Sequence, residues 1–228
     1  MYYSILLSQV DKISEDENKK IKKYVKSNSN VLILPWTFAK EMTCEEFEKN
    51  YFNVKRERYR RYLDFLNKFG IKKENIRYSN CYKENKDEIV DKINKSDLLL
   101  LPGGNPEMLF NKVVYDKEIL YSIKNYKGDI IGESAGAVLH FRKYFLTIEN
   151  SYKKCLEYCN GFGIIDDDFV ADVHTINTNN YINSLKDIGK HMEKNIYAIT
   201  DSEVVIYNRK DKKIEHNCAI NLPKSADI

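Results

Sequence analysis

Short, continuous apolar runs separated by longer polar segments constrain this chain more than any other feature of its sequence. The runs "VLIL" (31–34) and "LLLL" (98–101) contain no polar residue, as is typical of strands that are buried on both faces of a sheet. Candidate strands span 2–8, 30–36, 75–80, 97–103 and 129–133, with a later strand or hairpin over 197–208. This order predicts an α/β fold in which helices flank a mostly parallel sheet.

The segments between the strands have helical periodicity. They predict helices over 13–26, 43–69, 83–95, 106–124 and 178–194. In the longest segment, apolar residues recur in steps of three and four and form one stripe: Phe47, Tyr51, Val54, Tyr62, Phe65 and Phe69. Arg58 occupies the missing step of this stripe, so we expect a buried guanidinium that needs a carboxylate partner, either internal or on a substrate. The period is unclear between about 145 and 175, which is typical of functional loops.

The length and charge of the chain limit its domain organisation and partners. A chain of 228 residues suits one α/β domain spanning 1–228. A net charge of +3 is too small to indicate a polyanionic partner, and we interpret the basic segment 55–62 as a solvent-exposed helix face rather than a nucleic-acid surface. No apolar run is long enough to span a membrane, and the first residues do not resemble a signal peptide. We therefore expect a cytoplasmic monomer or homodimer that binds neither nucleic acid nor membrane.

The cysteines indicate reduced thiols. There are five, an odd number that does not indicate a disulfide framework: Cys44, Cys81, Cys155, Cys159 and Cys218. Cys155 and Cys159 lie four residues apart, but no second pair of cysteines or histidines completes a zinc site around them. We expect neither a metal nor a cofactor.

The segment "GESAG" (132–136) fits the pattern G-x-S-x-G. An apolar strand precedes it and a helix-compatible segment follows, so the serine stands on a sharp strand-to-helix turn. The chain passes so close to this turn that only glycine fits two residues to either side. The pattern predicts that Ser134 is a nucleophile.

A serine hydroxyl needs a base before it attacks a carbonyl group. Among the four histidines, we interpret His140 as a surface or packing residue, His191 as part of a polar helix end, and His216 as part of a solvated tail. His174 ends an apolar run and precedes a polar loop, where a strand end presents a side chain at the edge of a sheet. It is therefore the favoured base, and a loop histidine with only local hydrogen bonds is the alternative.

The base needs an orienting acid, and the reaction needs donors for an oxyanion. The candidate acids, among which sequence spacing does not choose, are Glu149, Asp166, Asp167, Asp168, Asp172 and Asp201. The candidate oxyanion donors are the backbone N–H of Ala135 and the glycine turn Gly103-Gly104, which follows a buried strand. Asn105 and Pro106 then suit the start of a helix. The candidate substrate-binding residues are Asn105, Glu133 and Arg58.

With these motifs in view, the chain resembles the dipeptidase E/cyanophycinase family of serine peptidases. The matching stretches are "GESAGA" (132–137), "GGN" (103–105), "NGFGIIDDDFVADVH" (160–174) and "AITDSEVVIYN" (198–208). The resemblance implies a three-layer α/β/α sandwich like that of the class I glutamine amidotransferases. It also implies that Ser134 is the nucleophile, His174 the base and Glu149 the acid, at a position where dipeptidase E usually has aspartate. Gly103, Gly104 and Ala135 would then form the oxyanion hole.

The resemblance implies a peptide substrate, since the best-known members of the family cleave dipeptides with an N-terminal aspartate or the aspartyl-arginine polymer cyanophycin. We expect a small peptide here. Val138 departs from the asparagine that many relatives carry after S-A-G-A, which bears on substrate preference. Two alternatives remain at this point. A carboxylester hydrolase of the α/β-hydrolase type shares the turn, although it usually places its histidine close to the C-terminus. A non-catalytic relative that binds a ligand would retain the same turn.

Overall fold

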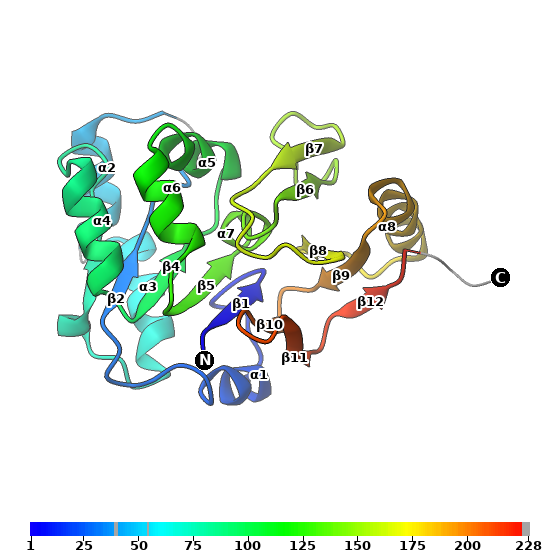
Figure 1. The fold of residues 1–228 in the computed structure, drawn as a ribbon, viewed down its shortest axis with the longest axis horizontal. Helices are drawn as coiled ribbons and strands as arrows, with labels where there is room; N and C mark the ends of the chain where they lie inside the picture. Colours follow the sequence, from blue (N-terminus) through cyan, green and yellow to red (C-terminus); the bar gives the residue numbers. More distant parts are fainter. Residues whose placement is uncertain (39–40, 54, 225–228) are drawn as a thin grey trace.

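The fold is built on a central sheet (Figure 1), and the computed structural model describes residues 1–38, 41–53 and 55–224. In these residues seven strands form the sheet in the order β11-β10-β1-β5-β4-β2-β3. Their bounds, in that order, are Lys213–Asn217, Val204–Asn208, Tyr3–Leu7, Asp129–Glu133, Leu98–Leu101, Val31–Ile33 and Ile76–Tyr78. The five strands from β1 to β3 run parallel, and β10 and β11 are antiparallel to their neighbours. The carboxyl ends of β1, β5 and β4 therefore lie side by side.

Helices cover both faces of this sheet. In β4, Leu99 and Leu101 pack into the core on one face, and Leu98 and Leu100 pack into the core on the other. This explains why the run "LLLL" has no polar residue. The first face is covered by α2 (Cys44–Tyr51), α4 (Lys86–Lys95), α5 (Pro106–Val114) and α6 (Lys117–Lys124), and the second by α1 (Glu15–Ile21) and α3 (Glu57–Asn67). The predicted α/β/α arrangement with a mostly parallel sheet is confirmed.

Two of the predicted helices are interrupted. The segment 106–124 divides into α5 and α6 because the Asp116 carboxylate accepts the N–H groups of Glu118 and Ile119 and starts a new helix. The segment 43–69 divides into α2 and α3, and Val54 of the predicted stripe lies outside the described residues. A single apolar stripe therefore does not continue through the segment. The prediction that Arg58 is buried is wrong: its side chain is exposed at the first turn of α3.

Two smaller sheets contain the irregular part of the sequence. The strands β6 (Lys143–Leu146) and β7 (Glu157–Asn160) form an antiparallel pair, and β8 (Phe169–Val173), β9 (Asn195–Ile199) and β12 (Ile220–Leu222) form a three-stranded sheet. Strand β8 runs parallel to β9, and α8 (Asn179–Met192) connects them. The segment 197–208 is thus not a hairpin, because β9 and β10 belong to different sheets. The connection 200–203 crosses from one sheet to the other beside the end of β1 (Figure 1).

Two short elements complete the described fold. They are the 3₁₀ turn Lys73–Asn75 and the short helix α7 (Ala135–Val138). The five cysteines are unpaired thiols. No helix in the described part of the chain combines the length and the apolar character that a bilayer crossing requires.

Candidate active site

Ser134 lies at the turn between β5 and α7. Its backbone has φ 48° and ψ −108°, a strained conformation for a residue with a side chain. Its N–H donates to the carbonyl of Leu7 at 2.8 Å, which holds the turn against β1. A Cβ atom on Gly136 would lie 2.0 Å from the carbonyl oxygen of Leu101, and one on Gly132 would lie 2.6 Å from that of Gly136. The two glycines of the motif are therefore required by close backbone approaches.

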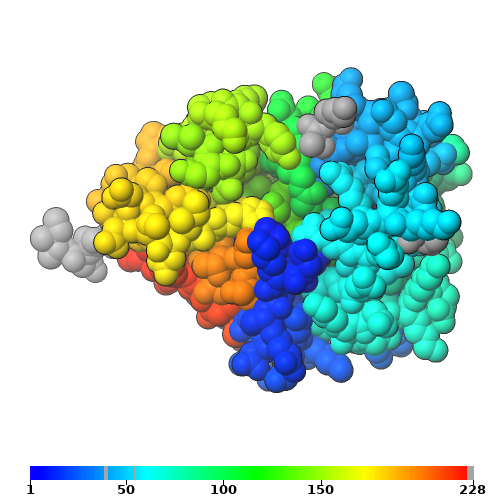
Figure 2. All heavy atoms as spheres, turned by 180° about the vertical axis from the view of Figure 1, so that it is seen from behind, coloured from blue at the N-terminus to red at the C-terminus, as the bar shows by residue number. Residues whose placement is uncertain are grey.

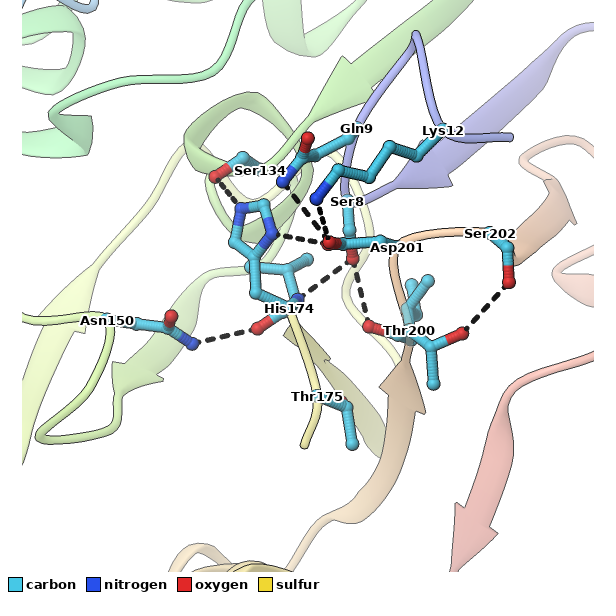
Figure 3. Close-up of polar contacts among 12 residues, drawn as sticks. Ser8, Gln9, Lys12, Ser134, Asn150, His174, Thr175, Thr200, Asp201 and Ser202 are labelled. Atoms are coloured by element: carbon cyan, nitrogen blue, oxygen red, sulfur yellow. Dashed lines mark hydrogen bonds and ion pairs between the residues drawn. The ribbon is translucent and has the colours of Figure 1, made fainter. Parts of the chain in front are cut away.

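His174 faces Ser134 from the end of β8 (Figure 3), and its Nε2 lies 2.9 Å from Ser134 Oγ. The backbone of His174 is in the left-handed region, with φ 57°. The Oγ of the buried Ser8 accepts the His174 N–H at 2.9 Å and donates to the carbonyl of Ile199, also at 2.9 Å. Ser8 thus joins the ends of β1, β8 and β9, and it fixes the position of the histidine.

Asp201 occupies the other side of the imidazole. Its Oδ1 lies 2.8 Å from His174 Nδ1, and its Oδ2 accepts from Lys12 Nζ at 2.9 Å and Gln9 Nε2 at 3.2 Å (Figure 3). Burial alone raises the pKa of a carboxyl group, but here the hydrogen bonds from Lys12 and His174 outweigh it and lower the pKa of Asp201. Asp201 is therefore placed as the ionised acceptor that orients the histidine.

The expectation that Glu149 is this acid needs correction. Glu149 lies in the turn after β6 and lines a cavity beside Ser134, but it makes no hydrogen bond to His174. The other candidates contact other parts of the chain: Asp166 pairs with Arg142, Asp167 accepts from Tyr207, Asp168 accepts from Asn195, and Asp172 accepts from Thr175 and Tyr181. Of the alternatives that the sequence left open, only Asp201 reaches the histidine.

The loop after β1 contributes residues that the sequence reasoning missed. Ser8, Gln9 and Lys12 all come from "SQVDK", and each contacts His174 or Asp201. On the face drawn in Figure 2, this N-terminal segment lies between the segment around α3 and the segments around 170–200. One feature of the sequence could have indicated these residues: they are polar and lie at the end of a predicted strand. Sites in α/β sheets form at the carboxyl ends of strands.

The other histidines lie away from this pair. His140 is fully buried, with Nδ1 2.7 Å from the carbonyl oxygen of Gly136, and burial lowers its pKa to about 3. It is therefore a neutral packing residue. His191 is exposed against the ring of Tyr158. The interpretation of His216 as solvated is wrong, because its Nε2 lies 2.6 Å from a carboxylate oxygen of Glu17.

Glu133, beside the serine, is a buried carboxylate with four donors. One oxygen accepts from the N–H of Val10 at 3.0 Å and from Arg61, and the other accepts from the Tyr62 hydroxyl at 2.7 Å and the N–H of Gly103 at 3.0 Å. Its side chain is only 1% exposed. Glu133 lines the larger cavity beside Ser134, but these four donors already occupy both of its oxygens, which gives it a structural role that the sequence did not predict. It joins three strand ends to α3, and Arg61 is the cation that neutralises it.

The contact between Glu133 and Gly103 also reduces the set of predicted oxyanion donors. The N–H of Gly103 donates to Glu133 and is therefore not available. The N–H groups of Gly104 and Ala135 make no hydrogen bond to the described residues. Gly104 has φ 139°, and a Cβ atom there would lie 1.8 Å from the carbonyl oxygen of Thr37, so this turn requires glycine. Asn105 caps α5 by accepting the Glu107 N–H at 3.0 Å, and it lines a neighbouring cavity that neither Ser134 nor His174 lines.

Two cavities flank Ser134. The larger, of about 450 Å³, is lined by Ser134, His174, Gly104, Tyr152, Arg58 and Arg61, among others. The second, of about 350 Å³, is lined by Ala135, Val138, Leu146 and Glu149 and shares Ser134 and His174. A hollow of about 1080 Å³ lies at the opposite edge of the sheet, against Asp97 and Asp129, and neither Ser134 nor His174 lines it. The two cavities beside Ser134 are of a size that takes a small ligand.

Ser134, His174 and Asp201 share the hydrogen-bonded arrangement by which serine hydrolases activate a hydroxyl, so fold and site together define a serine-type hydrolase. The model of peptidase family S51 matches residues 54–215. The chain therefore belongs to peptidase family S51 and is a serine-type peptidase. The predicted resemblance to the dipeptidase E/cyanophycinase family is confirmed.

Solved structures show the same fold. A peptidase E candidate from Listeria monocytogenes EGD-e superposes with a TM-score of 0.61 at 19% identity, covering 99% of this chain and 100% of that one. A peptidase from an acI-B1 Actinobacterium superposes with a TM-score of 0.60 at 16% identity, covering 91% of this chain and 84% of that one. A search of curated proteins finds no significant match to this chain.

Proposed function

We propose that this peptidase hydrolyses short peptides through an acyl-enzyme on Ser134. The observation that carries the proposal is the position of His174, which lies 2.9 Å from Ser134 Oγ through one ring nitrogen and 2.8 Å from Asp201 Oδ1 through the other. A neutral histidine held in this way can take the hydroxyl proton at Nε2 because Asp201 accepts the Nδ1–H and stabilises the imidazolium that forms.

The reaction then follows from these contacts. Ser134 Oγ attacks the peptide carbonyl, and its proton passes to His174. The tetrahedral intermediate collapses as His174 returns the proton to the leaving amine, which leaves an ester on Ser134. A water molecule, deprotonated by the same histidine, hydrolyses this ester and releases the second product.

The backbone of Ala135 and Gly104 supplies the donors for the oxyanion in this proposal. Both N–H groups make no hydrogen bond to the described residues, and Ala135 directly follows the nucleophile. Gly104 lines both cavities that contain Ser134. Donors fixed in the backbone need no reorganisation when negative charge develops on the carbonyl oxygen.

The proposed substrates are dipeptides with an N-terminal aspartate. Arg58 lines the larger cavity, donates to the hydroxyl of Tyr51 at 2.8 Å and has no carboxylate partner among the described residues. Its positive charge is thus available for the carboxylate of a substrate. Glu57, in the same cavity, offers a carboxylate for a free α-amino group.

The test combines mutation with a matched substrate series. Ser134→Ala and His174→Ala should each abolish hydrolysis of Asp-Leu, and the wild type should cleave Asp-Leu faster than Asn-Leu, which differs by one charge. A fluorophosphonate probe should label the wild type and not Ser134→Ala. Absence of both hydrolysis and labelling would instead support a non-catalytic relative, and cleavage of p-nitrophenyl esters without peptides would support a carboxylester hydrolase.

We further propose that the enzyme acts in the cytoplasm as a monomer or homodimer. Its five unpaired cysteines are typical of reducing compartments. Sedimentation of the purified protein in the presence of a reductant would measure the oligomeric state.

A further inference from the structure

A cluster of three different metal-binding side chains lies between α1 and β11, outside the site described above. Glu17 comes from α1, His216 from β11, and Cys218 directly follows β11. One carboxylate oxygen, one imidazole nitrogen and the thiol sulfur all lie within 4.8 Å of one another. The sequence does not show these residues as a group, because Glu17 and His216 are 199 positions apart.

The backbone explains why these side chains converge. Residues two apart on a strand point to the same face, so His216 and Cys218 face the same side of the sheet. Helix α1 covers this face, and the first turn of α1 presents Glu17 to it. Glu17 Oε2 lies 2.6 Å from His216 Nε2, and the side chains of His216 and Glu17 are only 20% and 12% exposed.

We propose that Glu17, His216 and Cys218 bind a zinc ion. Imidazole nitrogen, thiolate and carboxylate together are typical zinc ligands, whereas Mg²⁺ and Ca²⁺ prefer oxygen. Zinc bonds of about 2.0–2.3 Å place tetrahedral ligands roughly 3.3–3.8 Å apart, so the three atoms move about 1 Å or less to bind it. Water fills the fourth position.

Binding exchanges one set of contacts for another. The Cys218 thiol now donates to the carbonyl of Val204 at 3.2 Å, and zinc takes the thiolate while the thiol proton passes to solvent. Zinc also replaces the direct contact between His216 and Glu17. The ion then links α1 to β11 through metal–ligand bonds, where a hydrogen bond between Glu17 and His216 links them without it.

The site is joined to the loop that carries Asp201. Sγ of Cys218 accepts the N–H of Val204 at 3.0 Å, and the N–H of Ser14, the N-cap of α1, donates to the carbonyl of Ser202 at 3.2 Å. Zinc therefore stabilises the two segments that hold this loop. The inference stands independently of the proposed peptidase substrate, and its test needs no activity measurement.

The experiment titrates Zn²⁺ into chelator-treated, full-length protein by calorimetry. The wild type should bind one equivalent, and His216→Ala, Cys218→Ser and Glu17→Gln should each weaken binding on the order of 100-fold or abolish it. His174→Ala and the exposed-residue variants His191→Ala and Cys155→Ser are matched controls that should bind as the wild type does. Mg²⁺ should not bind. Unchanged affinity in His216→Ala, or loss of binding in His174→Ala, would overturn the proposal.

Cobalt provides a second readout that reports the ligand directly. Co²⁺ should give a thiolate-to-metal charge-transfer band in the wild type and in Cys155→Ser, and no band in Cys218→Ser. Circular dichroism establishes that each variant is folded, and Glu17→Gln, which preserves the size of the side chain, serves if His216→Ala does not fold. A wild-type protein without this band would also overturn the proposal.

Discussion

The Glu133 carboxylate accepts the backbone N–H of Gly103 at 3.0 Å, which links the ends of two neighbouring strands. The same carboxylate accepts the N–H of Val10, in the loop after β1. Glu133 therefore fixes the spacing of the three strand ends around Ser134, and both of its oxygens are occupied by donors from the protein. Because the glycine turn is held in this way, the N–H of Gly104 has no acceptor among the residues that the structure describes.

We expect Glu133→Gln to impair both stability and catalysis. A glutamine side chain retains one acceptor oxygen and has an amide donor in place of the other, so at least one of the four donors loses its partner. An unpaired buried donor costs about 1–3 kcal/mol of unfolding free energy. The displaced glycine turn should lower kcat for Asp-Leu more than it raises KM, because the oxyanion contact forms in the transition state.

Denaturant titration and steady-state kinetics well below the unfolding temperature measure these two effects. Glu149→Gln, which also removes a carboxylate near Ser134, is the control and should change neither quantity. A Glu133→Gln protein that is destabilised but retains the wild-type kcat would show that Glu133 serves stability alone.

Asp201→Asn should lower kcat/KM strongly while leaving the fold intact. Asparagine can present its amide to His174 Nδ1 and favour the wrong tautomer, and this change lowers kcat about 10⁴-fold in a serine protease that has the same triad. Glu149→Gln should remain within about twofold of the wild type, since Glu149 does not contact the histidine. Hydrolysis of Asp-Leu by the two variants, measured in parallel, decides whether Asp201 or Glu149 is the acid. A larger loss of activity in Glu149→Gln than in Asp201→Asn would restore Glu149 as the acid.

Arg58→Ala should raise KM for Asp-Leu about tenfold or more and leave hydrolysis of neutral dipeptides nearly unchanged. The lost interaction is a charge-assisted contact worth about 1.5–3 kcal/mol. Arg60→Ala removes an exposed charge from the same helix at a position that does not line the cavity, and it is the matched control. Equal effects of the two substitutions on KM would indicate a general electrostatic contribution in place of a specific one.

Asp172 should make the stability of the protein depend on pH. Burial raises the pKa of this carboxyl group from 3.8 to about 7, although Thr175 and Tyr181 donate to it. The folded state therefore binds a proton that the unfolded state releases, so the contribution of Asp172 to stability falls as pH rises from about 4 to 7. The slope approaches about 1.4 kcal/mol per pH unit.

Asp172→Asn removes this titration. The unfolding free energy of the wild type should therefore fall relative to that of the variant as pH rises from 5 to 7. Comparing the two proteins cancels the opposite contribution of His140, whose lowered pKa makes stability rise with pH up to about 6.5. Urea unfolding at several pH values measures the difference. Parallel curves for the two proteins would contradict the prediction.

The sequence determined what depends on neighbours along the chain. The apolar runs around 31–34 and 98–101 predicted strands buried on both faces, and Gly132 and Gly136 predicted the strained turn at Ser134. His174 was favoured because it follows a strand. The prediction of one helix over 43–69 is wrong because the hydrophobic periodicity of the sequence persists across a break between two helices. The prediction that Arg58 is buried assumed a single helix and is wrong for the same reason.

The tertiary structure alone decided which acid serves His174. Six carboxylates were equally available to the sequence, and Asp201 is 27 residues from the histidine. The parallel pairing of β8 and β9 places their carboxyl ends together, with Val173 opposite Ile199, and the connection to β10 then turns Asp201 toward the imidazole. The role of Glu133 was hidden for the same reason, since its four donors come from three other segments. Spacing along the chain determines local conformation, whereas strand pairing determines which distant side chains meet.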